Sequence, residues 1–325
     1  MINLLNFFLK HQLKRSKLAQ ISKGFTLIEL LIAIALSSIV IGTLLSFMRN
    51  ILNSERQEQA KAVTEQETQQ AIDYIANDLK QAVYIYDASG LNNSSTDTQP
   101  GIKNQIPPIS EAGNCKSTTP TCVPVLVFWK REFRSGILPV TGTAAKNDTF
   151  VYSLVAYYLI KGNSSTETWS NTARITRFEI RDGVINPISP TNNDGSPNYI
   201  TGETPSNGFK AFDLTITGTT LKDKMNRWQK TSGNYTVNAL TLVDFIDQNT
   251  NGIIPNCPTT TQQVPSTLAG GFYACVDSNT TSAQIYIRGN ALARISNNAT
   301  SASSQSTYFP TASVRVKSRG LLGIQ

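Results

Sequence analysis

The sequence predicts an α+β protein in which one long N-terminal helix is followed by a head built on an antiparallel β-sheet. The first observation is an apolar run over residues 25–48, in which Glu29 is the only charged residue. The second is the absence of Pro and Gly between Thr43 and Ser89, which predicts a helix that continues beyond the apolar run. The third is a series of short β-branched and aromatic segments after residue 122, separated by turn residues.

Residues 1–24 form a basic leader that no acidic residue offsets. The formal net charge of +7 includes five leader charges, which leaves +2 for the rest of the chain. Because basic flanks of apolar segments stay in the cytoplasm, the body of the protein is expected across the membrane. The basic isoelectric point belongs mostly to the leader and says little about a nucleic-acid partner. The five leader residues are Lys10, Lys14, Arg15, Lys17 and Lys23.

The apolar run of 24 residues is long enough to span a bilayer, for which an apolar helix of about 20 residues suffices. An ionised Glu29 is unfavourable inside such a segment, which marks it as a functional residue. If the chain is cut after Gly24, Phe25 becomes the new N-terminus. The helix geometry points this amine away from Glu29 of the same chain, but the amine of a neighbouring copy can reach it. Glu29 is therefore predicted to set the register between copies in an assembly.

The contiguous sequence KGFTLIE, from Lys23 to Glu29, resembles the prepilin signal of type IV pilins and type II secretion pseudopilins. The resemblance implies that a prepilin peptidase cleaves between Gly24 and Phe25 and methylates the new Phe25 amine. It also implies a pilin-like fold, assembly with other pilins or pseudopilins through the N-terminal helix, and an assembly role for Glu29. An ordinary signal anchor would account for the apolar run but not for Gly24, Phe25 and Glu29.

The resemblance also implies a location and a function. The protein is expected to be a single-pass inner-membrane protein with its head in the periplasm, which then enters a pilus or pseudopilus and, in a pilus, reaches the cell surface. A large head favours a minor pilin or pseudopilin, a structural, non-enzymatic assembly component of a type IV pilus-like or type II secretion-like machine. The alternative is a pilus-tip adhesin or receptor for DNA or acidic polysaccharide.

After a polar stretch at 50–70, apolar residues return with spacings of three or four, which predicts one face of an amphipathic helix. These residues are Ile72, Ile75, Leu79, Val83 and Tyr86. The predicted division is a cleaved leader at 1–24, a transmembrane part of the helix at 25–48, a periplasmic part at 49–87 and a globular β-rich head at 88–325.

Two further resemblances concern the subtype. Residues 71–85 resemble the corresponding helix end of larger minor members of the family, the J type of pseudopilin and the W type of minor pilin. Residues 283–295 and 308–320 resemble cyanobacterial pseudopilins linked to hormogonium polysaccharide secretion. This second resemblance implies a system for polysaccharide export during gliding motility.

Within the head, turn-forming residues predict loops at 88–121, 186–208 and 296–307. Asp182 and Gly183 predict a tight hairpin turn. Strands are predicted at 123–129, 150–160, 175–185, 211–217, 240–246, 272–276, 284–287, 292–295 and 313–317.

Four cysteines in an exported domain indicate disulfides. Four cysteines allow three pairings, and the sequence alone does not choose among them. Local pairing of Cys115 with Cys122 and of Cys257 with Cys275 is favoured, because each bond would close a loop in a Thr- and Pro-rich stretch. A zinc site is disfavoured, because the Cys-x-x-Cys spacing and a nearby His are missing.

The sequence carries no motif for catalysis or a cofactor, so no cofactor and no metal are expected. Its one histidine is His11, in the leader, so the cleaved protein could not use a His base. The segment Asp247–Gly252 reads D-x-N-x-N-G, like the start of a calcium loop. Pro258 stands where an EF-hand needs Glu, and a turn at a strand end is the preferred interpretation.

The head also contains one basic segment with an aromatic residue, made of Lys222, Lys224, Arg227, Trp228 and Lys230. Such a segment can bind an anionic polymer, either nucleic acid or acidic polysaccharide. A solvated loop between strands is the preferred interpretation, because charge runs usually are solvated. Salt-sensitive binding by the head would favour the receptor function instead.

Overall fold

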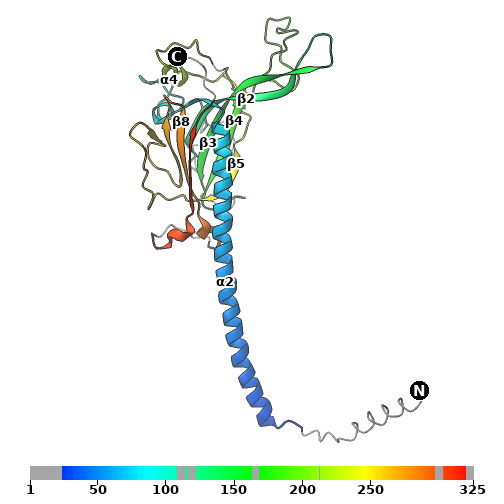
Figure 1. Ribbon diagram of the computed structural model, residues 1–325, viewed down its shortest axis with the longest axis vertical. Coiled ribbons are helices and arrows are strands. Elements are labelled where there is room, and N and C mark those ends of the chain that lie inside the picture. The colour runs from blue at the N-terminus through cyan, green and yellow to red at the C-terminus, as the bar shows by residue number, and fades with distance from the viewer. Residues whose placement is uncertain are drawn as a thin grey trace, which may run out of the picture. The chain divides into compact units, whose positions relative to one another are not determined.

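The computed structural model describes residues 24–107, 115, 122–162, 168–211, 213–296 and 303–319. The predicted leader up to Lys23 and parts of the predicted loops 88–121 and 296–307 lie outside these residues. The chain forms two compact units, one ending at Glu55 and one beginning at Arg56. Helix α2 (Leu27–Leu79) contributes to both units, and the second unit also contains two antiparallel sheets (Figure 1).

The described part of the first unit is residues 24–55, which include the apolar part of α2. Every residue from Gly24 to Arg56 is exposed. The mean hydropathy of the most apolar window is 2.5, and among the described residues this is the one helix long and apolar enough to cross a membrane. The structure thus confirms the apolar helix predicted over 25–48.

The second unit includes the remainder of α2, which packs on the head. Ile72, Ile75 and Leu79 are completely buried, which confirms that the apolar face of the helix covers the core. The helix ends at Leu79, however, and not at the predicted residue 87.

The chain leaves the helix after Leu79 because the next residues complete a sheet. Strand β1 (Ala82–Ile85) pairs antiparallel with β2, and all four of its residues are buried. Val83 and Tyr86 continue the helical spacing of the sequence, yet both reach the core from extended backbone. Pairing with a distant strand here overrides the local pattern.

The first sheet has the order β1–β2–β3–β4–β5, and each neighbouring pair is antiparallel. It confirms the strands predicted at 123–129, 150–160 and 240–246. β2 and β3 form a hairpin that extends past their neighbours (Figure 1). The bounds are β2 Cys122–Pro139, β3 Lys146–Lys161, β4 Ala173–Arg181 and β5 Leu240–Ile246.

The second sheet has the antiparallel order β6–β7–β8–β9 and shares one core with α2 and the first sheet. It confirms the strands predicted at 272–276, 284–287 and 313–317, whereas β6 was not predicted. At Gly289, after β8, a Cβ atom would lie 2.5 Å from Thr64 Cγ2, so the glycine permits α2 to pack closely. The bounds are β6 Gln262–Val264, β7 Phe272–Asp277, β8 Ser282–Arg288 and β9 Thr311–Lys317.

The predicted hairpin turn at Asp182 and Gly183 is wrong. The Asp182 N–H donates to the Tyr152 carbonyl at 2.9 Å, so pairing with β3 continues past the end of β4. The chain then pairs Ile185 with Tyr199 across the predicted loop. The short helices α3 (Ala88–Asn92) and α4 (Leu221–Asn226) lie in segments between the strands.

Two predicted strands are also wrong. In the described part of 211–217, Asp213 Oδ1 accepts hydrogen bonds from the N–H and hydroxyl of Thr215, which closes a local turn. At 292–295, Asn290 Oδ1 accepts the Ala293 N–H and starts the 3₁₀ helix η1 (Ala291–Arg294). A second 3₁₀ helix, η2, spans Ser303–Tyr308. In both corrected segments a polar side chain competes with strand pairing for the backbone donors.

Candidate functional site

The predicted cleavage position lies at the exposed start of the first unit. Gly24 and Phe25 precede the first turn of α2. No atom lies within 4 Å of the position that a side chain on Gly24 would take, and its φ is outside the left-handed region. The fold of the chain therefore gives no physical reason for a glycine at this position.

Glu29 has a partner within its own chain. Its N–H donates to Thr26 Oγ1 at 3.3 Å, and its Oε2 accepts the N–H and the hydroxyl of Thr26, both at 3.1 Å. This reciprocal arrangement is a capping box, which satisfies N–H groups that the start of a helix leaves unpaired. The Thr-x-x-Glu spacing is the sequence signal for it, and the role of Glu29 as a cap was not predicted.

The cap uses one carboxylate oxygen of Glu29. Within residues 24–55, Oε1 makes no hydrogen bond or ion pair. A cation placed at this oxygen in an apolar environment would interact far more strongly than in water. Glu29 can thus cap its own helix and accept an amine from another chain at the same time.

Between Leu30 and Met48 the exposed surface is predominantly apolar on all sides of the helix. A helix that is apolar all round is expected in a membrane or in the core of a large protein. Among the described residues of the first unit, no other element covers this surface.

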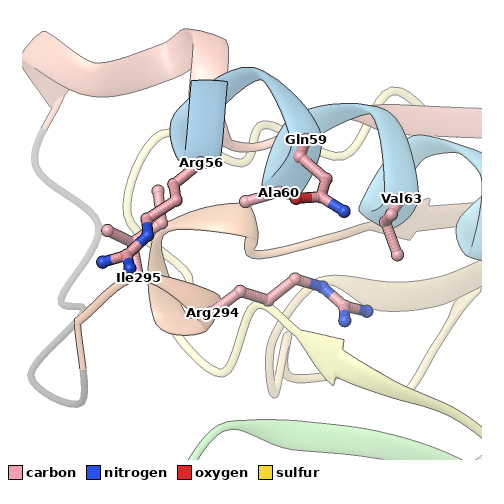
Figure 2. Close-up of a pocket in the computed structure, with 6 residues that line it drawn as sticks. All are labelled: Arg56, Gln59, Ala60, Val63, Arg294 and Ile295. Carbon is pink, nitrogen blue, oxygen red and sulfur yellow. The ribbon is translucent and has the colours of Figure 1, made fainter. Parts of the chain in front are cut away.

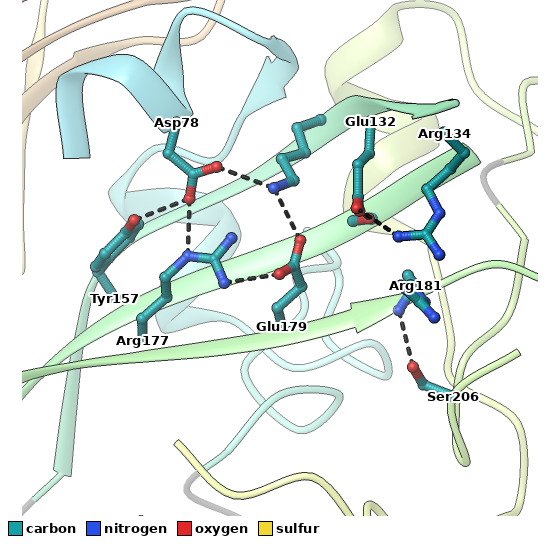
Figure 3. A network of polar contacts seen from close by, with 10 residues as sticks. Asp78, Glu132, Arg134, Tyr157, Arg177, Glu179, Arg181 and Ser206 are labelled. Atoms are coloured by element: carbon teal, nitrogen blue, oxygen red, sulfur yellow. Dashed lines mark hydrogen bonds and ion pairs between the residues drawn. The ribbon is translucent and has the colours of Figure 1, made fainter. Parts of the chain in front are cut away.

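The junction between α2 and the head is a closed ring of four charged side chains (Figure 3). Asp78, in the last turn of α2, contacts Lys130 on β2 at 3.0 Å and Arg177 on β4 at 2.9 Å. Glu179 completes the ring through Lys130 at 2.9 Å and Arg177 at 2.7 Å. Tyr157 on β3 donates its hydroxyl to Asp78 Oδ2 at 2.8 Å. The end of the helix is therefore fixed to three adjacent strands.

Burial opposes ionisation of both acids in the ring, but their cationic partners outweigh it. Hydrogen bonds and charges from Arg177 and Lys130 lower the pKa of Asp78 and of Glu179 below their ordinary values. Burial likewise opposes the charge on Lys130, and the two carboxylates reverse this effect and raise its pKa. All members of the ring are thus charged over the whole physiological range. The partners are 52 and 99 residues from Asp78 in the sequence, so no local pattern reveals the ring.

A hollow of about 440 Å³ lies between α2 and η1 in the second unit (Figure 2). Arg56 and Gln59 line it from the helix, and Arg294 lines it from η1. Arg294 is already committed to α2, because it pairs with Glu67 and donates to Thr64 Oγ1 at 2.9 Å. The hollow therefore belongs to the packing of the helix on the head and holds no acid–base pair suited to catalysis.

The structure confirms both locally paired disulfides. Cys115 is bonded to Cys122, the first residue of β2, and Cys257 is bonded to Cys275 in β7. The first bond anchors Cys115 to the first sheet, and the second anchors Cys257 to the second sheet. Within the described residues, no group of three or more His, Cys, Asp or Glu side chains could hold a metal ion.

The basic segment is largely part of the head's own packing. Trp228 is completely buried, stacks edge-on against Trp129 with 5.3 Å between ring centroids, and donates its indole N–H to Lys210 O. Its ring cannot stack on a base or sugar, so the predicted contact through Trp228 is wrong. Lys222 contacts the buried carboxylate of Asp87 at 2.6 Å.

The other basic residues of the segment differ in their surroundings. Lys224 donates to Leu214 O and Lys230 donates to Gly233 O, both at 2.9 Å. Arg227 is exposed. Of the five residues predicted to contact a polyanion, four therefore contact the protein itself, and binding through this segment stays a prediction.

The segment Asp247–Gly252 forms a turn at the end of β5. Asp247 is buried, and its Oδ1 accepts the Asn249 N–H at 3.0 Å. Arg288 Nε lies 3.4 Å from Asp247 Oδ2, and Arg288 also donates to Asn251 O. Burial raises the pKa of Asp247, which the Asn249 N–H and the Arg288 charge oppose. The Arg288 guanidinium thus occupies the place beside the Asp247 carboxylate that a calcium ion would need.

A comparison with known families identifies the N-terminal segment. The prokaryotic N-terminal methylation motif matches residues 21–45, which include Gly24, Phe25 and Glu29. This match supports a place among type IV pilins and pseudopilins, and it implies processing by a prepilin peptidase and assembly with other pilins. No curated protein and no solved structure shows a significant match to the chain.

Proposed function

We propose that this chain is a minor pilin or pseudopilin, a structural and assembly component of a type IV pilus-like or type II secretion-like machine. One observation carries the proposal. The methylation motif at residues 21–45 covers most of a continuous apolar helix whose side chains are all exposed. Such a helix needs an apolar environment, and the motif belongs to proteins that move from a membrane into a filament.

In the proposed pathway, a prepilin peptidase cuts after Gly24 and methylates the Phe25 amine. The apolar part of α2 holds the protein in the inner membrane with its head in the periplasm. It then enters the core of a pilus or pseudopilus. The open surroundings of Gly24 support this order, because the peptidase provides the reason for glycine that the chain's own fold does not.

Glu29 is proposed to accept the Phe25 amine of a neighbouring subunit through its open Oε1. Thr26 holds the other oxygen, so the carboxylate is already oriented before assembly. In the membrane the same two hydrogen bonds from Thr26 partly replace the water that the Glu29 carboxylate loses. The amine of the neighbour then supplies the missing charge in a low-dielectric environment.

The head is proposed to be structural rather than enzymatic. Its buried charges form a ring that joins helix to sheet, and its disulfides anchor Cys115 and Cys257 to β2 and β7. Its size supports a minor position in the filament. The resemblance of 283–295 and 308–320 supports polysaccharide export and motility as the process that it serves, and Arg227 is the exposed basic residue of the alternative receptor function.

The test is N-terminal mass spectrometry of the full chain produced together with a prepilin peptidase. The wild-type chain should begin at methylated Phe25, whereas Gly24→Val should keep its leader. Ser16→Val, within the leader, is the control and should be cleaved. A mature Phe25 terminus in Gly24→Val, or an uncut wild-type chain beside an active peptidase, would contradict the proposal.

A further inference from the structure

The outer edge of β5 is open. β5 is the last strand of the first sheet, and no strand of the described chain pairs with its side away from β4. Its far end is closed, because Ile246 bridges to Gly289 and the Phe245 carbonyl accepts the Asn290 N–H. The open stretch is therefore 240–244. A row of unpaired backbone donors and acceptors is a template for another strand.

The sequence of β5 leaves this edge unprotected. β9, at the edge of the second sheet, carries Arg315 and Lys317, the kind of charged residues that discourage strand pairing. β5 reads LTLVDFI and contains no Lys or Arg. Leu240, at its start, is 72% exposed. Among these two edges, β5 is the one that offers an apolar, β-branched surface to a partner.

A groove of about 760 Å³ lies beside β5, lined by residues 241–245, by 168–170 and by α2. Tyr74 on α2 is 49% exposed and Trp169, before β4, is 44% exposed, and both line this groove. Aromatic rings with one apolar face exposed are typical of protein–protein contact surfaces. They provide contacts for side chains of a strand laid along β5.

The charge of the groove favours a cationic occupant. Its charged lining residues are Glu67, Asp244 and Arg294, so its formal charge is −1. Glu67 pairs with Arg294. Asp244 accepts hydrogen bonds from Ser170 N and Oγ but has no cationic partner within the described residues. A Lys or Arg on the occupant would complete this site.

At the end of the groove, the backbone of Phe245 is held in an unusual conformation. Phe245 has a φ of 57°, which is unfavourable for a residue other than glycine. The conformation is held by the Asn290 N–H on its carbonyl, by Asp244 Oδ1 on its N–H, and by the Arg294 guanidinium 4.0 Å from its ring centroid. Strained backbone held by several contacts is frequent at binding sites.

We propose that the β5 edge binds an extended, cationic segment of a partner protein by strand addition. The segment would form backbone hydrogen bonds with residues 240–244 and place a Lys or Arg opposite Asp244. The residues of this surface belong to the second unit and not to the apolar part of α2 through which assembly is proposed.

The test uses the detergent-solubilised full chain and a fluorescent peptide, Thr-Val-Lys-Val-Thr-Val-Lys-Val-Thr. Saturable binding is expected, with a Kd well below about 1 mM. The counterpart with Glu in place of Lys should bind at least about tenfold more weakly, since it would face Asp244 with like charge. Two further peptides carry N-methyl groups on alternate amides, one at the odd positions and one at the even positions. One of these two phases of N-methylation should abolish binding and the other should leave it unchanged, because only one edge of the added strand faces β5.

Matched variants locate the site. Leu240→Lys should weaken binding of the Lys peptide about tenfold and Leu240→Glu should strengthen it. Thermal unfolding should not change, because the side chain is exposed. Arg315→Glu, on the edge of the other sheet, should leave the Kd unchanged.

Three results would overturn the proposal. One is the lack of saturable binding up to about 1 mM. Another is an equal loss of binding in both phases of N-methylation, or a Kd that changes as much in Arg315→Glu as in Leu240→Lys. The third is a concentration-dependent dimer of the full chain that Leu240→Lys abolishes without any peptide binding, which would assign the edge to a second copy.

Discussion

The two halves of α2 share one continuous helix and differ in what stabilises them. Ile39, in the first half, is 64% exposed, whereas Ile75, in the second, is completely buried. The first half has no covering element in its own unit, and the second half is fixed by an apolar core and a ring of charges. The helical conformation alone therefore does not show which contacts stabilise each half of α2. The second half is stabilised by the head, whereas the first half is proposed to depend on a membrane or another chain.

The largest expected effect tests the external partner of the first half. Glu29→Val should leave Gly24 cleavage intact and nearly abolish recovery of the protein in sheared filaments. The reason is that an unpaired charge in an assembled low-dielectric core typically costs about 3–5 kcal/mol. The measurement is the ratio of this protein in the sheared fraction to that in the membrane.

Two further variants separate capping from pairing at this site. Glu29→Gln keeps an oxygen for the Thr26 cap and loses the charge, so it should also fail to assemble. Thr26→Val removes the cap and keeps the carboxylate, so it should assemble better than Glu29→Gln. Normal recovery of Glu29→Val would show that the carboxylate does not set register.

The second prediction concerns the ion pairs that join the second half of α2 to the head. Asp78→Ala should lower the free energy of unfolding of the full chain in detergent by about 3–5 kcal/mol, because Lys130 and Arg177 lose a buried counter-ion. Asp73→Ala, on the same helix but exposed, should change it by less than about 0.5 kcal/mol. Chemical denaturation followed by circular dichroism measures both. Equal effects of the two substitutions would show that the ring does not hold the helix.

A matched pair of isoleucines compares the halves directly. Ile75→Ala should destabilise the head by about 2–5 kcal/mol, through lost burial and the cavity that remains. Ile39→Ala removes the same atoms from an exposed position and should leave head unfolding unchanged. Tryptophan fluorescence during denaturation reports the head, since Trp129 and Trp228 are buried there. A comparable loss in Ile39→Ala would contradict the separation of the two halves.

The smallest effect is a dependence of head stability on acid pH. The folded pKa values of Asp78 and Glu179 lie below their ordinary values of 3.8 and 4.5. Their contribution to stability is therefore complete above about pH 5 and is lost as pH falls through the folded values. The Tm of the full chain should be flat from neutral pH to about pH 5 and should fall below it, with a smaller fall in Asp78→Asn. An unchanged slope in Asp78→Asn would assign the acid lability to other groups.

Much of the fold follows from sequence patterns, and the failures have physical causes. Strands with dense β-branched residues, such as 150–160 and 240–246, and the apolar helix were predicted because their signals are local. The helix end was misplaced because Val83 and Tyr86 fit both a helical face and a buried strand. Pairing with β2 decides between these, and it depends on residues more than 40 positions away.

The candidate site divides in the same way. The motif around Gly24 and Glu29 is contiguous and was recognisable, and the Thr26 cap had a signal in the Thr-x-x-Glu spacing. Trp228 was misassigned because the sequence does not show which aromatic residues face the core. The Asp78 ring assembles residues from one helix and two strands, so only the folded structure brings them together.

The charge ring also determines how the head bears mechanical load. Near the end of α2, Asp78 is one of the points that pass tension to the head, and its two oxygens divide the pull between Lys130 on β2 and Arg177 on β4. These strands flank β3 and are hydrogen-bonded to it along their length, so the force is taken in shear by three central strands. The chain itself continues from α2 into β1, an edge strand, which alone would peel from the sheet one bond at a time. The ring adds a second connection that reaches the central strands. If the chain works in a filament as proposed, the ring would let tension bypass the edge strand β1 and load the centre of the sheet.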